Sequence, residues 1–295
     1  MRILSLFDGI SCGRVALERA GIQIEKYYAS EIEEGPIEIS KKNYPDIIQL
    51  GDVTKITKDM VGDIDLIIGG SPCQSFSLAG NKKGFEGKSG LFYEYVRILK
   101  EVKPKYFLLE NVKMKQEWAD VISEELGVEP IEINSNLLSG QNRKRLYWTN
   151  IQNIEQPKDK DIFLQDILED EVDERYYLTE SNIKTINRNF GCKGKTLNLD
   201  IDNSLIEKIT YPSRINQKFG KIKCPTLTAA MGMGGGNVPV IIRGGKIRKL
   251  TEIECERLQT LPDNYTAGVC STKRYKSIGN GWTVEVIKHI FKNIK

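Results

Sequence analysis

Short apolar segments alternate with amphipathic ones through the first half of the chain, and this alternation restricts the fold more than any other feature. Strands are predicted at 2–7, 26–30, 64–70, 105–111, 129–133 and 145–151. Helices are predicted between them, at 13–21, 91–102 and 118–126. Strands that alternate with helices form a parallel sheet covered on both faces. The pattern therefore predicts an α/β domain with a Rossmann-like sheet.

The alternation stops after residue 151, where the charge becomes uneven. Residues 155–180 hold ten acidic and three basic side chains, whereas 181–249 hold thirteen Lys or Arg against three acidic residues. A long basic segment is the footprint expected for a polyanionic partner, and a solvated surface is an equally good explanation. The sequence alone leaves both explanations open.

Helical patterning returns near the end of the chain, over 248–262 and 283–294. We therefore expect three segments: a large α/β domain over 1–165, a small irregular insert over 166–247, and a return to the large domain over 248–295.

Composition excludes several classes of protein. Asp8 interrupts the first apolar run, so no secretory leader is expected, and no run approaches the roughly 18 apolar residues of a membrane span. The six cysteines form no CxxC pair and the chain has one histidine, which argues against a zinc site and against Ser-His or Cys-His catalysis. We expect a cytoplasmic protein with reduced thiols and no metal.

The ends of the first predicted strands carry groups that suit a nucleoside. "FDGISCG" (7–13) opens a helix after the first strand, Glu31 follows the second, and Asp52 lies in "GDV" (51–53). Ligands of open α/β sheets bind at the carboxyl ends of the strands, and an acid after the second strand accepts from ribose hydroxyls. Each acid alone would pass for a surface residue, but together they predict a pocket for an adenosine-containing cofactor.

Four further motifs follow in order: "SPCQSFS" (71–77), "ENV" (110–112), "QNRKR" (141–145) and "YKSIGNGW" (275–282). This set resembles the signature of the DNA cytosine-5 methyltransferases. The resemblance spans nearly the whole chain outside 152–220 and is strongest to the vertebrate de novo catalytic domain and its phage or bacterial relatives. Ser11 departs from it, because many bacterial members have a glycine there, but a small residue fits.

The resemblance implies that a methyl group passes from S-adenosyl-L-methionine, leaving S-adenosyl-L-homocysteine, to C5 of a cytosine flipped out of duplex DNA. The Cys73 thiolate would attack C6, because this addition makes C5 electron-rich. Glu110 would hold a proton against N3. Arg143 and Arg145 would bind cytosine O2 and the adjacent phosphate, and we place Arg143 at the base.

The resemblance also assigns the remaining site residues. The cofactor would contact Phe7, Asp8, Gly9, Ile10, Glu31, Ile32, Asp52, Val53, Pro72, Leu91, Asn280 and Trp282. The DNA would contact Ser75, Ser77, Gln141, Thr226, Gly234 and Gly235. The Gly-, Ser- and Lys-rich residues 74–90 would form a loop that closes over the flipped base, and the insert over 166–247 would recognise a short target sequence.

Two other functions stay open at this point. One is a tRNA cytosine methyltransferase, a branch that carries a Cys-Phe-Thr tripeptide absent here. The other is a regulatory DNA-binding paralogue, which typically lacks one of the catalytic residues that this chain retains. We expect the protein to act as a monomer on double-stranded DNA, with oligomers left open. The target sequence and the biological role, whether restriction-modification, phage self-protection or regulation, do not follow from the sequence.

Overall fold

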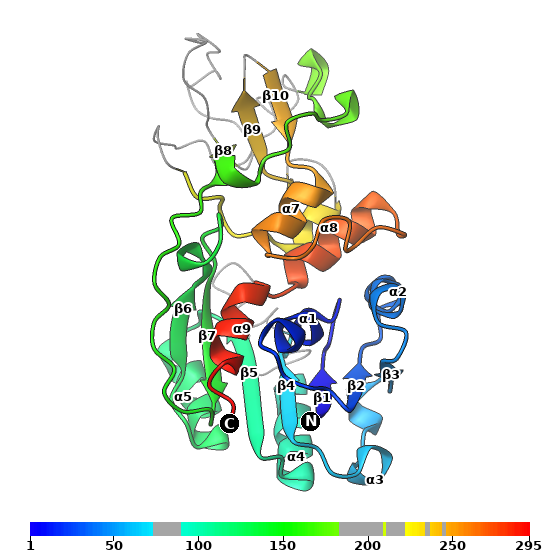
Figure 1. Ribbon diagram of the computed structural model, residues 1–295, viewed down its shortest axis with the longest axis vertical. Helices are drawn as coiled ribbons and strands as arrows, with labels where there is room; N and C mark the ends of the chain where they lie inside the picture. Colours follow the sequence, from blue (N-terminus) through cyan, green and yellow to red (C-terminus); the bar gives the residue numbers. More distant parts are fainter. Residues whose placement is uncertain (73–89, 183–208, 211–221, 234–236, 244–245) are drawn as a thin grey trace. The chain divides into compact units, whose positions relative to one another are not determined.

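The computed structural model describes residues 1–72, 90–182, 209–210, 222–233, 237–243 and 246–295. Its main element is a seven-stranded sheet with strand order β3-β2-β1-β4-β5-β7-β6 (Figure 1). The strands are β1 (Arg2–Leu6), β2 (Lys26–Ser30), β3 (Ile48–Gln49), β4 (Leu66–Gly69), β5 (Tyr106–Val112), β6 (Ile131–Asn134) and β7 (Lys144–Thr149).

The sheet confirms the predicted α/β fold, with one difference in strand direction. Strands β1 to β5 are parallel, whereas β7 runs antiparallel to both β5 and β6. The strand order reverses between β1 and β4, and this reversal is where ligands of such sheets bind. The segments that leave the carboxyl ends of β1 and β4 are therefore the expected position of a ligand-binding site.

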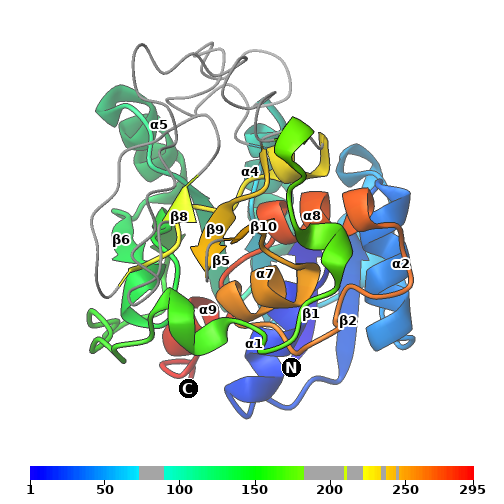
Figure 2. The ribbon, with the colours of Figure 1, turned by 90° about the horizontal axis from the view of Figure 1, so that it is seen from above.

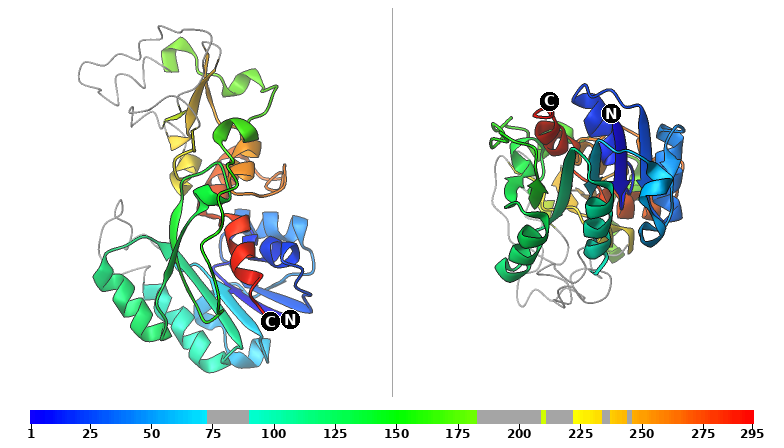
Figure 3. Two further views of the ribbon diagram at one scale, coloured as in Figure 1. Left: turned by 60° about the vertical axis from the view of Figure 1, so that its left-hand side comes forward. Right: turned by 90° about the horizontal axis from the view of Figure 1, so that it is seen from below.

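Helices cover both faces of this sheet (Figure 3). They are α1 (Cys12–Arg19), α2 (Glu34–Asn43), α3 (Lys58–Val61), α4 (Phe92–Val102), α5 (Gln116–Leu126) and α9 (Val284–Phe291), with a short 3-10 turn, η1 (Val53–Lys55). Helices α4 and α5 lie on one face, and α1 and α9 lie on the other (Figure 3).

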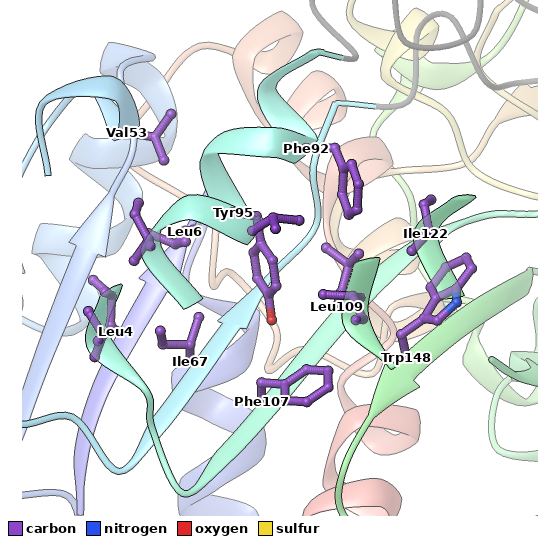
Figure 4. Close-up of a cluster of buried hydrophobic side chains, with 14 of the residues drawn as sticks. Leu4, Leu6, Val53, Ile67, Phe92, Tyr95, Phe107, Leu109, Ile122 and Trp148 are labelled. Atoms are coloured by element: carbon purple, nitrogen blue, oxygen red, sulfur yellow. The ribbon is translucent and has the colours of Figure 1, made fainter. Parts of the chain in front are cut away.

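The α4 and α5 face holds a continuous apolar core (Figure 4). Leu4, Ile67 and Leu109 come from three adjacent strands and point to the same face of the sheet. They pack with Tyr95 of α4 and Ile122 of α5. Alternate strand residues share one face, so the same strands present Ile3 and Ile68, both fully buried, to the opposite face. Burial of this apolar surface holds the strand ends rigidly for the site.

The chain divides into two compact units at points other than the three expected segments. The first unit comprises 1–134, 144–158 and 284–295, and the second comprises 135–143 and 159–283. Of the expected C-terminal return over 248–295, the structure gives only α9 to the first unit. The second unit takes the rest, because Cys255 and Ile278 belong to one apolar cluster with Leu227.

Among the residues that the structure describes, the second unit contains helices α7 and α8 and a small antiparallel sheet of order β10-β9-β8 (Figure 2). Its elements are η3 (Ser135–Leu137), η4 (Leu164–Ile167), η5 (Glu174–Tyr176), β8 (Ile209–Thr210), η6 (Ala229–Met233), β9 (Val240–Arg243), β10 (Lys246–Lys249), α7 (Glu252–Leu258) and α8 (Ser271–Asn280). A second apolar cluster, including Leu164, Leu227, Cys255 and Ile278, forms its core.

The helical pattern expected from residue 248 begins later in the structure, at Glu252. Residues 246–249 pair with β9 instead. Thr251 then caps α7: its hydroxyl accepts from the Glu254 N–H at 3.1 Å, and the Glu254 carboxylate accepts from the Thr251 N–H at 2.9 Å. Among the described residues, no helix has the length and apolarity that a bilayer crossing requires.

Candidate active site

The turn after β1, residues 7–11, has an unusual backbone at the strand-order reversal. Phe7, Gly9 and Ser11 have φ of 58°, 60° and 60°, a left-handed conformation that costs free energy for the two residues other than glycine. A Cβ on Gly9 would meet nothing within 4 Å, so the space beside this turn is open. The positive φ at Ser11 is a conformation that glycine adopts without strain and that serine does not.

Asp8 and Ser11 hold this turn in place. The Asp8 carboxylate accepts from the Tyr27 hydroxyl at 2.7 Å and from the Ser11 hydroxyl at 2.5 Å. Ser11 Oγ also lies 2.6 Å from Ser40 Oγ of α2. Burial raises the pKa of Asp8 to about 6, against the opposing effect of these hydroxyl donors. The hydrogen bonds of Ser11 offset its backbone strain. No sequence motif pointed to Tyr27 or Ser40.

Glu31 is held directly beside the turn. Its Oε2 accepts from the Gly9 N–H at 2.9 Å, and its Oε1 accepts from the Ile32 and Glu33 N–H groups, both at 2.8 Å. Three backbone donors thus fix the carboxylate at the end of β2. Ile32, next to it, is an exposed apolar side chain at 73%. An ordered acid beside an exposed apolar side chain and open space fits the ribose and base of an adenosine.

Asp52 is oriented in a similar way near β3. Its Oδ1 accepts from the backbone N–H and the hydroxyl of Thr54, at 3.0 and 2.9 Å, and these bonds lower its pKa. The Val53 side chain is buried in the core, which leaves only its backbone for a ligand. Pro72 and Leu91 are half-buried. Phe7 packs against the core and Ile10 is buried.

Glu110 and Arg145 form an ion pair between β5 and β7. Arg145 Nε lies 2.8 Å from Glu110 Oε1, and the two side chains are only 13% and 10% exposed. Glu110 stands opposite Tyr147 in the antiparallel ladder, and Arg145 stands opposite Val112. A nearly buried carboxyl beside a guanidinium is a built polar site within the first unit.

Asn111 links this strand to the segment that leaves β4. Its amide Nδ2 donates to Ser71 Oγ at 3.1 Å and to Ser71 O at 3.4 Å, and both residues are buried. The bond fixes the chain two residues before Cys73. Cys73, Ser75, Ser77, Gly234 and Gly235, all predicted site residues, lie outside the described part of the chain.

Arg143 and Gln141 are buried in the second unit, away from solvent. The Arg143 guanidinium donates to the carbonyls of Leu227, Gly279 and Gly281 at 2.8, 3.3 and 3.0 Å. Gln141 is fully buried, and its amide oxygen accepts from the Leu227 N–H at 2.8 Å. The structure therefore engages both side chains with protein groups, although the sequence assigned them to the base and the DNA.

The other predicted residues of the second unit lie nearer its surface. Thr226 donates its hydroxyl to the Asn142 carbonyl at 2.6 Å. Asn280, the last residue of α8, is exposed, and Trp282 is half-buried. Within the described part of the chain, no three His, Cys, Asp or Glu side chains gather as a metal site would require.

Comparison with known proteins identifies the family. A model of the C-5 cytosine-specific DNA methylase family matches residues 1–295. The type II methyltransferase M.Bsp6I of a Bacillus species is 32% identical, covering 100% of this chain and 98% of its own. The type II methyltransferase M.HhaI of Haemophilus parahaemolyticus is 29% identical, over 100% of this chain and 94% of its own.

Solved structures share the fold at lower identity. A DNA modification methyltransferase encoded within an Escherichia coli prophage has a TM-score of 0.72 at 19% identity, covering 100% of this chain and 98% of its own. A methyltransferase of Entamoeba histolytica has a TM-score of 0.75 at 17% identity, covering 100% and 99%. Together with the full-length match to the family model, these likenesses confirm the resemblance: the chain belongs to the C-5 cytosine-specific DNA methylase family.

Proposed function

We propose that this cytosine-5 DNA methylase uses S-adenosyl-L-methionine to methylate a cytosine flipped out of double-stranded DNA, with Glu110 and Arg145 as the groups that hold the base. The ion pair between these two side chains is the observation that carries the proposal. A carboxyl group and a guanidinium 2.8 Å apart match the adjacent N3 and O2 atoms of cytosine.

The geometry favours Arg145, rather than Arg143, at cytosine O2. Arg145 already lies beside Glu110, so both can reach neighbouring atoms of one base. The Arg143 guanidinium donates hydrogen bonds to three main-chain carbonyls of the second unit. We therefore revise the sequence-based preference: Arg143 supports the protein backbone, and Arg145 contacts the base.

Covalent catalysis by Cys73 completes the mechanism. Its thiolate forms a bond to C6, and the electron pair displaced in the ring moves toward N3, where the carboxylic acid form of Glu110 supplies a proton. The electron-rich C5 would then take the methyl group that the sulfonium supplies, leaving S-adenosyl-L-homocysteine, and the N3 proton would return to Glu110. The C5 proton leaves to water, and cleavage of the S–C6 bond restores the aromatic ring and releases the thiolate. The bond between Asn111 and Ser71 holds the preceding backbone for this attack.

The cofactor supplies, when bound, a methyl group activated on a sulfonium. The residues of the first unit fit it: the Gly9 turn leaves open space, Glu31 offers an ordered acceptor for ribose hydroxyls, and Asp52 offers one for a purine amine. Ile32 presents an apolar surface for the base. From the second unit, the resemblance adds Asn280 and Trp282 as cofactor residues and Thr226 as a DNA contact.

Methyl transfer from labelled S-adenosyl-L-methionine tests this function. We expect label on C5 of cytosine in mixed-sequence duplex DNA, no label with Cys73→Ala, and normal labelling with the control Cys270→Ala, which removes an exposed free thiol. Bisulfite sequencing of the product reads the target site. Label on tRNA and none on DNA would contradict the proposal.

A further inference from the structure

Gln259 is a fully buried side chain that lies outside the motifs quoted from the sequence. It comes just after α7 and makes four hydrogen bonds. Its Nε2 donates to the carbonyls of Ile278 and Gly281 at 2.8 and 3.0 Å. Its Oε1 lies 2.9 Å from the Thr283 hydroxyl and 3.2 Å from Gln141 Nε2, both of which donate to it. An amide has two donors and two acceptor lone pairs, so this side chain is fully satisfied.

One side of this network holds the segment 278–283 at the end of α8. Carbonyls at a helix C-terminus lack partners within the helix and need others. Gln259 supplies donors to Ile278 and Gly281, and Arg143 donates to Gly279 and Gly281. The held segment contains Asn280 and Trp282, the two residues of this unit that we assign to the cofactor.

The other side of the network reaches the segment 224–227. Gln141 joins Gln259 to it, because its amide oxygen accepts from the Leu227 N–H at 2.8 Å. The Leu227 carbonyl accepts from Arg143. Leu227 follows Thr226, the residue that we assign to the DNA. An unbroken set of hydrogen bonds thus connects the two segments through Gln259, and none of the four bonds of its side chain returns to α7.

We propose that Gln259 is a positioning residue. It holds the segment 278–283 in the position that contacts the cofactor and Thr226 in the position that contacts the DNA. The proposal rests on the proposed function for the roles of Asn280, Trp282 and Thr226. Gln259 itself touches neither ligand. Its loss is therefore expected to weaken the binding of both ligands, while the chemical step at Glu110 and Arg145 in the first unit proceeds.

Gln259→Met tests this, because methionine keeps the length of the side chain and removes all four hydrogen bonds. We expect KM for S-adenosyl-L-methionine and KM for duplex DNA each to rise about tenfold, with kcat within about threefold of wild type. Calorimetric titration of S-adenosyl-L-methionine without DNA is expected to show the same rise in Kd. Thr283→Val, which removes one of the four bonds, is expected to raise the cofactor KM about twofold to threefold.

The control is Leu164→Ala, which removes a buried side chain from the apolar cluster of the same unit but no bond of the network. It is expected to lower Tm and leave both KM values unchanged. If Leu164→Ala raises both KM values as much as Gln259→Met does, general loosening explains the effect and the inference is wrong. The inference is also wrong if wild type methylates DNA and both Gln259→Met and Thr283→Val keep wild-type KM values.

If Gln259→Met fails to fold, the KM values of Thr283→Val alone test the role of Gln259.

The proposed function and the role of Gln259 fail in different ways. Wild-type protein that transfers no methyl group to DNA cytosine overturns the proposed function, whereas active wild-type protein with unaltered binding in the variants overturns only the role of Gln259.

Discussion

Replacing Glu110 by glutamine is expected to lower kcat for DNA methylation by about 10²- to 10⁴-fold, the usual contribution of a positioned proton donor. The glutamine oxygen still accepts from Arg145 Nε, so the bond between β5 and β7 that now spans 2.8 Å survives and the fold is retained. A glutamine amide cannot give up a proton to N3, however. The electron pair that the thiolate displaces toward N3 is then not stabilised by protonation.

The matched control for this variant is Glu132→Gln, the same change in the same sheet. Glu132 of β6 pairs with Lys113 and Lys144 at 2.8 and 3.8 Å on the surface, where ion pairs contribute little. Steady-state kinetics with duplex DNA should show wild-type kcat for this control. A Glu110→Gln enzyme whose kcat stays within about threefold of wild type would remove Glu110 from the mechanism.

Gly279→Ala is expected to destabilise the second unit severely. A Cβ on Gly279 would lie 2.2 Å from both the carbonyl carbon and the oxygen of Thr228, and 2.5 Å from the Ala229 nitrogen. These are backbone atoms, so α8 and η6 would have to separate. Overpacking of this kind costs typically about 1–3 kcal/mol and sometimes more, and we expect the upper end, with Tm lower by about 5–10 °C.

Gly127→Ala separates this steric effect from backbone strain. Gly127 follows α5 with φ of +69°, and a Cβ there would meet nothing within 4 Å. Only the left-handed backbone opposes alanine at this position, at a cost of about 1 kcal/mol. Thermal unfolding should therefore give a Tm for Gly279→Ala that is well below the Tm of Gly127→Ala. The reverse order would mean that α8 and η6 do not pack as the structure shows.

Much of the sheet follows from the sequence because its strands are buried on both faces. Such strands read as continuous apolar runs, and the predicted segments at 26–30 and 105–111 match β2 and β5 closely. Helix α2 was missed because Gly35 and Pro36 interrupt its first turn, although proline is tolerated there. Helix α8 was missed because Gly279, which its packing requires, resembles a turn residue.

The sequence predicts those site residues that nearby residues in the chain identify. The strand-end pattern identified Glu31 and Asp52, since side chains that follow parallel strands collect at one edge of a sheet. The family resemblance identified Glu110. The choice between Arg143 and Arg145 was not predictable, because it depends on carbonyls more than 80 residues away in the chain. Gln259 lies four residues after buried Cys255, and this helical spacing was the one available signal that the amide faces the core.

The most direct test of the mechanism is the covalent adduct between Cys73 and the target base. Duplex DNA in which 5-fluorocytosine replaces cytosine cannot lose its C5 substituent after methyl transfer, so the S–C6 bond should persist. With S-adenosyl-L-methionine present, we predict a denaturation-resistant complex whose peptide map places the DNA on Cys73. The complex should also form with Cys270→Ala and not with Cys73→Ala. An adduct that forms equally well with Cys73→Ala, or an enzyme that methylates cytosine normally but yields no adduct, would contradict the account.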